Sequence, residues 1–574
     1  MLHNLRLTWA VALAAQTLLA QSVSPPRIFP LSEVRAGQTG VGRTVFSGDR
    51  IEEFQVHILG ILRNAGPKQS IILARLSGGP LAETGVLQGM SGSPVYIDGR
   101  LAGAVALSFP NSKVPIAGIR PIEDMLKVDE SPASAPRAAL PAHAADSEGL
   151  REIATPVSFS GFTQAALDHF APQLATLGLT PCQGVSSGAD LPSRMGNPST
   201  LRPGGMISVE LLSGDMSAGA DGTVTAVDGN RIYAFGHPFL SGGDTDLPFA
   251  RATVLALLPS ITSSFKISAP QEWMGAITQD RGTAVSGLLG RTASLAPLNI
   301  KVIGEHGTHT YKMRMVSDRA FSPLLTQMAV FSAITATERA AGSVAYELRG
   351  EASFAPGVPP LKLDNAYAGD FAVAALAALG VAAPLNSALN SGYDALRLSR
   401  LDLEVRASET HRIMDIAQVV ASKTQASPGD DVDILVTFSG YNGVETQRKL
   451  RYKIPIGATP GPLQFVVSDA ATANAGDYLA LATATPRDAA RVVELLNGLR
   501  DNRKAYVRVL RAEASFTVRG ETLPDPPPSY ALILAKAQPV LGIAGAPSKL
   551  AEFPIDAGGD IVSGSQSVTV QVKP

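Results

Sequence analysis

Apolar and polar residues alternate along much of the first quarter of the chain. The segment GRTVFSGDRIEEFQVHILGIL, residues 42–62, alternates on both sides of a polar turn, Ser47-Gly48-Asp49. Two further apolar runs follow, IILARL and VYIDGRLAGAVAL, and the second is divided by Asp98-Gly99, a dipeptide typical of hairpin turns. A period of two marks half-buried strands, so we expect a β-rich unit over residues 27–128.

The remainder of the chain continues this pattern with three helical interruptions. TQAALDHFAPQLATLG, residues 163–178, begins at a threonine suited to capping and ends at a glycine. FAVAALAALGVAAPL, residues 371–385, is rich in alanine and interrupted by a glycine and a proline, which favours a pair of packed helices over a membrane crossing. RDAARVVELLNGLRDN, residues 487–502, has the spacing of an amphipathic helix.

The length of 574 residues is too great for one hydrophobic core, so several domains are expected. DESPASAPRAALPAHAADSEG, residues 129–149, has no apolar period and is typical of a linker. Short strands with regular turns after residue 400 suggest a β-sandwich. The expected divisions are a signal peptide at 1–20, β-rich units at 27–128 and 204–350, the linker, a small helical insertion at 150–203, alanine-rich helices at 351–399, and a β-rich carboxy-terminal domain with one helix at 400–574.

The amino terminus has the composition of an export signal. Arg6 precedes the apolar run LTWAVALAAQTLLA, and Ala20 suits a cleavage site. The alternative is an uncleaved anchor helix, but the run is shorter than the ~20 apolar residues that a membrane span needs. We therefore expect an exported protein, periplasmic or extracellular, with no membrane span after removal of the signal.

Charge and cysteine content narrow the possible partners. The formal net charge is −2 and no long basic run occurs, so the sequence gives no electrostatic reason to expect nucleic acid as a partner. Cys182 is the only cysteine, which excludes an intrachain disulfide and a cysteine-based metal cluster. The expected partner is a protein or peptide substrate, with no cofactor and no metal. The sequence does not indicate an oligomeric state.

The stretch GMSGSP, residues 89–94, contains a candidate nucleophile. A serine hydroxyl needs a base to take its proton and N–H donors to hold the oxyanion. Two glycines flank Ser91 and permit a tight turn, in which the N–H groups of Gly89 and Ser91 form an oxyanion hole if the geometry is trypsin-like. Ser93 replaces the last glycine of the α/β-hydrolase motif, and no helix pattern follows.

GMSGSP followed by a hairpin and a GAV strand resembles the serine motif of the SpoIVB family of serine peptidases. The preceding ETGVLQ, residues 83–88, matches that family's run ahead of its serine. The resemblance implies that Ser91 is the nucleophile and that the fold is mostly β. It also implies two trypsin-like β-barrel halves, here joined to a short helical segment and a sandwich-like carboxy-terminal region.

The same resemblance selects a histidine among eight. The family's histidine follows a strand that ends in Gly-His, and AFGH, which ends at His237, fits that pattern. His57 lies inside an alternating strand and is expected to be an ordinary strand residue. In the SpoIVB proteins the histidine segment precedes the serine segment, whereas here Ser91 precedes His237. The two barrel halves are therefore predicted to occur in swapped order, which triad chemistry tolerates because geometry matters more than chain order.

The triad acid is the least defined member. The resemblance aligns Ser77 with the family's aspartate, and a serine cannot stabilise an imidazolium as a carboxylate does. Asp244, Asp246 and Asp280 follow the histidine, and we favour Asp244 because it shares the glycine-rich loop with His237. An ordinary turn-capping role for Asp244 is the alternative.

Three functions are compatible with these residues. The first is an exported serine endopeptidase that uses Ser91 and His237. The second is a protease scaffold that has lost catalysis and acts as a secreted or periplasmic interaction protein, suggested by the missing aspartate and the large carboxy-terminal region. The third is a metal-dependent hydrolase built on EHGTH, residues 305–309, with Glu305, His306 and His309 as ligands, although Gly307 disfavours the helix that such spacing suits.

Overall fold

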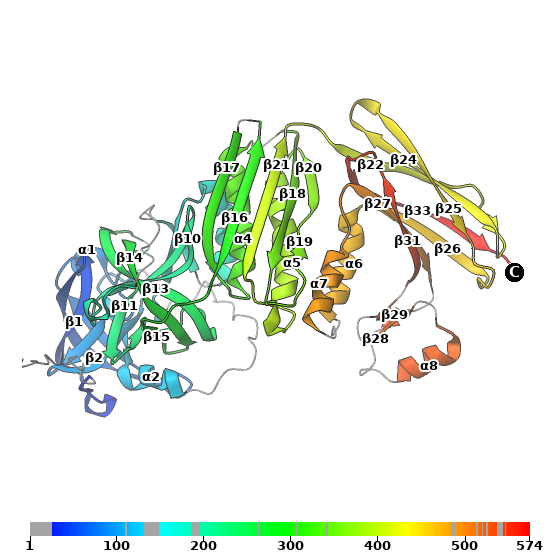
Figure 1. The fold of residues 1–574 in the computed structure, drawn as a ribbon. Coiled ribbons are helices and arrows are strands. Elements are labelled where there is room, and N and C mark those ends of the chain that lie inside the picture. The colour runs from blue at the N-terminus through cyan, green and yellow to red at the C-terminus, as the bar shows by residue number, and fades with distance from the viewer. Residues whose placement is uncertain are drawn as a thin grey trace, which may run out of the picture.

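The computed structural model describes residues 26–574 apart from 110–111, 131–148, 178, 185–194, 262, 306, 339–341, 484–487, 513–514, 519–520, 524–525, 537–543 and 546. The predicted signal peptide and most of the predicted linker lie outside the described residues. The fold is mostly β, with 52% of residues in strands and 20% in helices. Figure 1 shows two curved sheets together at one end, a flatter sheet backed by helices in the middle, and a sandwich toward the carboxy terminus.

The first sheet closes into a barrel of six strands, named here the serine barrel. Its order is β4-β1-β2-β3-β6-β5, and pairing of β4 with β5 completes the ring. Both predicted hairpins are confirmed, because β1 turns into β2 after Ser47 and β4 turns into β5 at Asp98-Gly99. The strands are β1 (Thr39–Ser47), β2 (Arg50–Gly66), β3 (Gln69–Ser77), β4 (Pro94–Ile97), β5 (Arg100–Ser108) and β6 (Ile116–Pro121).

Alternation along these strands builds the barrel core, as the sequence pattern predicts. On β2, Phe54, Val56 and Ile58 are buried while the residues between them are exposed. His57 is one of those exposed residues and is an ordinary strand residue, as expected. A short helix, α1 (Leu81–Thr84), precedes the serine motif. A second short helix, α2 (Ile122–Leu126), follows the last strand of the barrel.

A seventh strand joins this barrel from beyond the predicted linker. β7 (Arg151–Glu152) pairs with the end of β5, so that Leu107 lies opposite Glu152. The sequence places these two residues in a helical insertion at 150–203. That segment contains one long helix, α3 (Gln164–Thr176), whose predicted cap is confirmed because Thr163 Oγ1 accepts a hydrogen bond from the Ala166 N–H.

The second sheet contains 14 strands and forms two parts. In one part, β10, β13, β14, β15, β12 and β11 follow one another and β10 also pairs with β11; we name this part the histidine barrel. Its strands, together with two that extend it, are β8 (Thr155–Ser160), β9 (Leu179–Gln183), β10 (Met206–Gly214), β11 (Ser217–Asp228), β12 (Arg231–Ala234), β13 (Gly243–Leu258), β14 (Phe265–Arg281) and β15 (Ala284–Leu289).

The other part of this sheet is the flatter layer of Figure 1, covered on one side by α4 (Phe321–Thr337) and α5 (Val373–Leu389). The prediction of two helices at 371–385 is wrong, because α5 is continuous through Gly380 and Pro384. A Cβ at Gly380 would lie 1.8 Å from the Tyr367 hydroxyl, so this glycine admits a neighbouring ring and does not end the helix. The strands are β16 (Leu295–Gly304), β17 (Gly307–Val316), β18 (Val344–Ser353), β19 (Leu361–Lys362), β20 (Asn365–Gly369) and β21 (Arg400–Ser408).

The boundary expected at residue 400 falls at the start of β21, which pairs with β16 and β18 of this layer. The sandwich begins at the next strand and consists of a four-stranded and a five-stranded sheet, with a small three-stranded sheet beside them. Its strands are β22 (Ile413–Ala421), β23 (Gln425–Ala426), β24 (Asp431–Gly440), β25 (Glu445–Lys453), β26 (Gly461–Ser468), β27 (Lys504–Arg511), β28 (Ser515–Val518), β29 (Glu521–Leu523), β30 (Ala544–Gly545), β31 (Ser548–Asp556), β32 (Ile561–Ser563) and β33 (Ser565–Val572).

The expectation of one helix in this last region is wrong, because its described residues form three α-helices: α6 (Ala470–Thr483), α7 (Ala489–Asn497) and α8 (Pro528–Lys536). The helix predicted at 487–502 is confirmed as α7, and Asp488 caps it by accepting a hydrogen bond from the Arg491 N–H. No helix within the described residues combines the length and the apolar character that a membrane crossing needs.

The histidine barrel encloses ionisable groups. Glu210 and Asp221 are 3% and 2% exposed, and Asp221 accepts a hydrogen bond of 2.6 Å from Ser268 Oγ. Burial raises the pKa of Asp221 to about 6 and that of Glu210 to about 8. Within the described residues Glu210 Oε1 has no hydrogen-bond partner, so the protonated acid is the form that this core accommodates.

We predict that Glu210→Gln makes the protein less sensitive to rising pH. The folded state holds the Glu210 proton up to pH about 8, whereas an unfolded chain releases it near 4.5, so the wild-type free energy of unfolding falls between those values. Glutamine stays neutral and removes this contribution. Urea unfolding across that range is expected to show a growing advantage for the variant as pH rises. A constant difference at all pH values would contradict the prediction.

Candidate active site

The serine motif forms a tight turn between α1 and β4, and we name residues 89–93 the serine turn. Gly89 and Gly92 have φ angles of +88° and +90°, which is why glycine is required at both positions. The Gly92 N–H donates to the Val105 carbonyl over 2.8 Å, and the Val105 N–H donates to the Ser93 carbonyl over 2.9 Å. The turn is thereby fixed against β5 and leads into Pro94 at the start of β4.

Threonines of the histidine barrel hold the other side of the serine turn. The Thr223 N–H donates to the Ser91 carbonyl over 2.8 Å, and Thr223 Oγ1 donates to the Gly89 carbonyl over 2.8 Å. Thr225 Oγ1 donates to the Gly92 carbonyl over 2.7 Å. Both threonines lie on β11, so this one strand binds three carbonyl groups of the serine turn and joins the two barrels at Ser91.

The backbone orientation at Gly89 and Ser91 suits an oxyanion hole. The carbonyl and N–H of a trans peptide point in opposite directions. The Gln88 carbonyl accepts from the Lys266 N–H on β14, and the Met90 carbonyl accepts from the Ser93 N–H, at 3.2 and 2.9 Å. The N–H groups of Gly89 and Ser91 therefore point away from these partners. Neither N–H group donates a hydrogen bond to any of the described residues.

His237 follows β12 in a loop, residues 235–242, that we name the histidine loop. Phe235 and Gly236 have φ angles of +70° and +71°, and for a phenylalanine this is a strained conformation. The loop packs directly on the serine barrel, because a Cβ at Gly236 would lie 3.0 Å from the Ala106 Cβ of β5. A Cβ at Gly92 would lie 2.5 Å from the Phe235 nitrogen. The structure thus brings the segments of Ser91 and His237 together at the junction of the barrels.

The His237 ring has the tautomer that a general base needs. Its Nδ1 lies 2.7 Å from the Pro238 carbonyl oxygen. Because a carbonyl can only accept, Nδ1 carries the proton and Nε2 presents its lone pair. The side chain is 2% exposed, and burial lowers the pKa of His237, which keeps the ring neutral.

Ser91 and His237, the candidate nucleophile and base, are both buried and are not hydrogen-bonded to each other. Ser91 is fully buried, and within the described residues neither its Oγ nor His237 Nε2 has a hydrogen-bond partner. The Ser91 hydroxyl can donate a hydrogen bond, and the unprotonated Nε2 of His237 can accept one. Catalytic hydrogen bonds are often loose without substrate, so this arrangement is compatible with a Ser–His pair that closes in the reacting complex.

The candidate acids occupy different positions around the histidine loop. Asp244, the favoured acid, has a side chain 54% exposed, and its Oδ1 accepts from Gln279 and Arg281 at 2.9 Å each. No hydrogen bond joins it to His237, whose Nδ1 is taken by Pro238. Asp280 is buried and accepts three N–H groups of the histidine loop, from Phe239, Leu240 and Gly242. Asp280 therefore shapes the loop. Asp246 binds Arg291 and the Ser294 N–H, and Ser77 is exposed at the end of β3.

Three further ionisable residues lie next to the serine turn or the histidine loop. Lys266 is 1% exposed, its stem lies beside Gly89, and its Nζ donates to Thr44 Oγ1 over 2.8 Å. Burial lowers the pKa of Lys266 to about 7. Arg120 and Glu152 approach the histidine loop from the serine barrel, and the Glu152 charge raises the pKa of His237 against the effect of burial. Apart from the helix and strand patterns around them, these residues carry no local motif.

Residues 15–126 match the family model of the SpoIVB peptidase S55 family. The resemblance to SpoIVB-type peptidases is confirmed over this segment. It includes the serine turn and almost all of the serine barrel, whereas His237 and everything after residue 126 lie outside it. No curated protein and no solved structure is significantly similar to the chain. The resemblance to SpoIVB-type peptidases therefore rests on the family match over residues 15–126.

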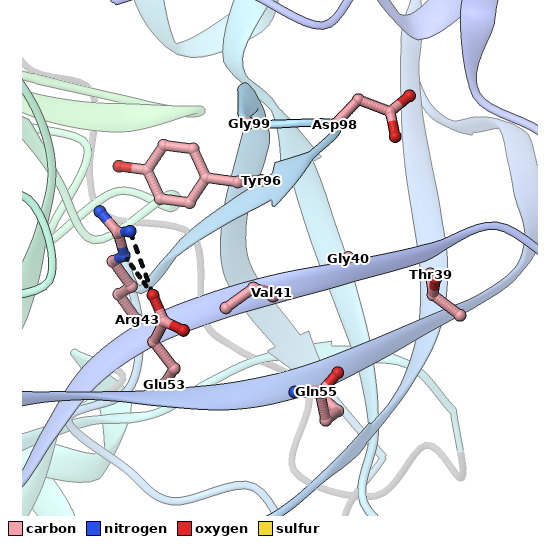
Figure 2. Close-up of a pocket in the computed structure, with 9 residues that line it drawn as sticks. All are labelled: Thr39, Gly40, Val41, Arg43, Glu53, Gln55, Tyr96, Asp98 and Gly99. Atoms are coloured by element: carbon pink, nitrogen blue, oxygen red, sulfur yellow. Dashed lines mark hydrogen bonds and ion pairs between the residues drawn. The ribbon is translucent and has the colours of Figure 1, made fainter.

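An open cavity on the serine barrel lies away from Ser91 and His237. It has a volume of about 340 Å³ and is formed by β1, β2, β4 and the Asp98-Gly99 turn (Figure 2). Arg43 pairs with Glu53 at 3.1 Å, and its guanidinium lies over the Tyr96 ring at 5.0 Å. Neither Ser91 nor His237 lines the cavity, so it contributes no reacting group.

The alternative metal site gains no support from the described residues. They contain no group of three or more histidine, cysteine, aspartate or glutamate side chains suited to hold a metal ion. His309 lies on β17 and is exposed, while His306 falls outside the described residues.

We predict that Gly92→Ala separates the two barrels. A Cβ at Gly92 would lie 2.0 Å from the Thr223 carbonyl oxygen, and φ is already +90°. We expect a loss of ~3 kcal/mol or more in the free energy of unfolding, because backbone of both barrels must move. Gly99→Ala is the matched control, since it shares a positive φ of +70° but meets nothing within 4 Å. Its expected cost is ~1 kcal/mol. Equal losses in urea unfolding would contradict the prediction.

Proposed function

We propose that the protein is an exported serine endopeptidase of the SpoIVB type that forms an acyl-enzyme at Ser91. The observation that carries this proposal is that Ser91 Oγ and His237 Nε2 are both buried without a hydrogen-bond partner among the described residues, on segments that meet at the junction of the two barrels. The family match supports the peptidase class. The apolar run after Arg6 supports export.

The reaction follows from the roles of these groups. Ser91 Oγ transfers its proton to His237 Nε2 and bonds to the carbonyl carbon of the scissile peptide. The Gly89 and Ser91 N–H groups receive the resulting oxyanion. The imidazolium then gives its proton to the leaving nitrogen, the C–N bond breaks, and an acyl ester remains on Ser91. A water molecule, deprotonated by the same nitrogen, hydrolyses the ester and restores the serine.

The Pro238 carbonyl takes over one task of a triad acid. In a Ser–His–Asp triad the carboxylate holds the tautomer and stabilises the imidazolium. Here the hydrogen bond of 2.7 Å to Nδ1 performs the first task with a neutral acceptor. Asp244 remains a prediction for the triad acid; in this structure its Oδ1 accepts from Gln279 and Arg281, while Nδ1 of His237 is bonded to Pro238.

A second candidate is the catalytically retired scaffold, a secreted or periplasmic interaction protein. The burial of Ser91 and the missing Ser–His hydrogen bond favour it, because a substrate must open this junction before it reaches the nucleophile. A zymogen that awaits processing has the same features.

A fluorophosphonate probe distinguishes these functions. We expect the mature wild-type protein to be labelled at Ser91, identified by peptide mass spectrometry. His237→Ala is expected to slow labelling by ~10³-fold or more, because the base is lost. His57→Ala is the matched control and is expected to label as the wild type does, since His57 lies on the exposed side of β2. Folded protein that acquires no label at Ser91 would favour the retired scaffold.

A further inference from the structure

Arg120 joins the serine barrel to the histidine loop from inside the protein. It lies at the end of β6 and is 3% exposed. Its Nε donates to the Gly236 carbonyl over 3.2 Å, directly before His237, and its Nη1 donates to Gln69 Oε1 over 2.7 Å. A buried guanidinium is costly unless it is paired, so its retention here indicates a specific task.

Glu152 supplies the negative partner of this guanidinium. Its Oε1 lies 3.8 Å from Arg120 Nη2, and its side chain is 34% exposed. Backbone pairing holds it in place, because Glu152 lies opposite Leu107 of β5 and the next residue donates its N–H to the Ala106 carbonyl over 2.9 Å. Gly236 packs on that same stretch of β5, against Ala104 and Ala106. β7, β5 and the histidine loop therefore meet at one place.

From this geometry we propose that Arg120 and Glu152 are positioning residues for His237. Arg120 fixes the peptide that precedes the histidine, and Glu152 provides the negative charge that balances both Arg120 and the imidazolium. The second task is the one that the Pro238 carbonyl, a neutral acceptor, does not perform. In this proposal the balancing carboxylate comes from beyond the linker, on a strand that joins the serine barrel, and Asp244 of the glycine-rich loop is the alternative.

The charges that face His237 agree with this division. Three ionisable groups act on the ring: Glu152 from β7, Arg120 from β6 and Asp280 from β14. The two carboxylates raise the pKa of His237 and the guanidinium lowers it, with Glu152 the strongest of the three. Asp280 already accepts hydrogen bonds from three backbone N–H groups of the histidine loop, which largely compensate its charge. Glu152 is the more available counter-charge.

The electrostatic part of the proposal is tested on the full chain without reference to activity. Histidine labelled with ¹³C in the ring is titrated by NMR, and His237→Gln assigns the resonance. Glu152→Gln is expected to lower the titration midpoint of His237 by at least ~0.5 pH unit, and Glu152→Lys by more. Arg120→Met is expected to raise it. Glu33→Gln, which breaks an exposed pair with Arg100 on the same barrel, should leave it unchanged.

Opposite shifts in the glutamate and arginine variants support the proposal, whereas unchanged midpoints or shifts in one direction overturn it. If Arg120→Met does not fold, the two Glu152 variants still test the proposal, because a partly exposed side chain tolerates substitution. The midpoint must then fall further in Glu152→Lys than in Glu152→Gln. A purely structural role does not predict shifts ordered by charge.

The kinetic part rests on the proposed function and uses the pH dependence of Ser91 labelling. Glu152→Gln is expected to lower both the rate plateau, by ~10-fold or more, and the pH of the acidic limb, and Glu152→Asp is expected to recover part of each. The two failures are distinguishable. Absent labelling with the predicted NMR shifts refutes the peptidase and supports the positioning pair. His237-dependent labelling with unmoved midpoints supports the peptidase and refutes the pair.

Discussion

The candidate site depends on the hydrogen bonds that one strand makes to one turn. The serine turn lies at the edge of its own barrel, and glycine flexibility alone leaves it several conformations. Thr223 and Thr225 remove that freedom by binding the carbonyls of Gly89, Ser91 and Gly92. A turn anchored at three points presents its N–H groups in one direction. Since both threonines belong to the histidine barrel, correct docking of the barrels and correct shape of the nucleophile turn are the same event.

The close approach of the barrels explains the unusual glycines. Gly92 and Gly236 face opposite barrels, and each has backbone or small side chains where a Cβ would be placed. The strained Phe235 lies between β12 and His237, where the chain must reverse to reach the serine barrel. Close backbone contacts therefore form one part of the junction. Long side chains form another, because Arg120 and Lys266 each make a hydrogen bond from one barrel to the other.

Local sequence patterns predict the elements of this structure better than their partners. Alternation around His57 and the Asp98-Gly99 turn was sufficient for the strands of the first barrel, because period and turn chemistry are local properties. GMSGSP and AFGH select Ser91 and His237 through the resemblance to the SpoIVB family, and the catalytic roles of both residues stay predictions. The prediction that α5 is interrupted is wrong because Gly380 makes room for the ring of Tyr367, which lies on another element, and does not end its own helix. Glu152 was missed because a two-residue strand has no period, and its place is fixed by pairing with β5.

The pairing of β10 has a further consequence for cooperativity. This strand is bonded to β11 and β13 near its start and to β17 near its end, so the histidine barrel and the helix-backed layer share one continuous hydrogen-bond ladder. Melting either part exposes unpaired backbone in the other. The serine barrel has its own closed ring and meets its neighbour through isolated bridges such as Gly48 with Val254. Ser91 and His237 thus lie on two separately closed barrels, and the junction that brings their segments together exists only while both barrels are folded.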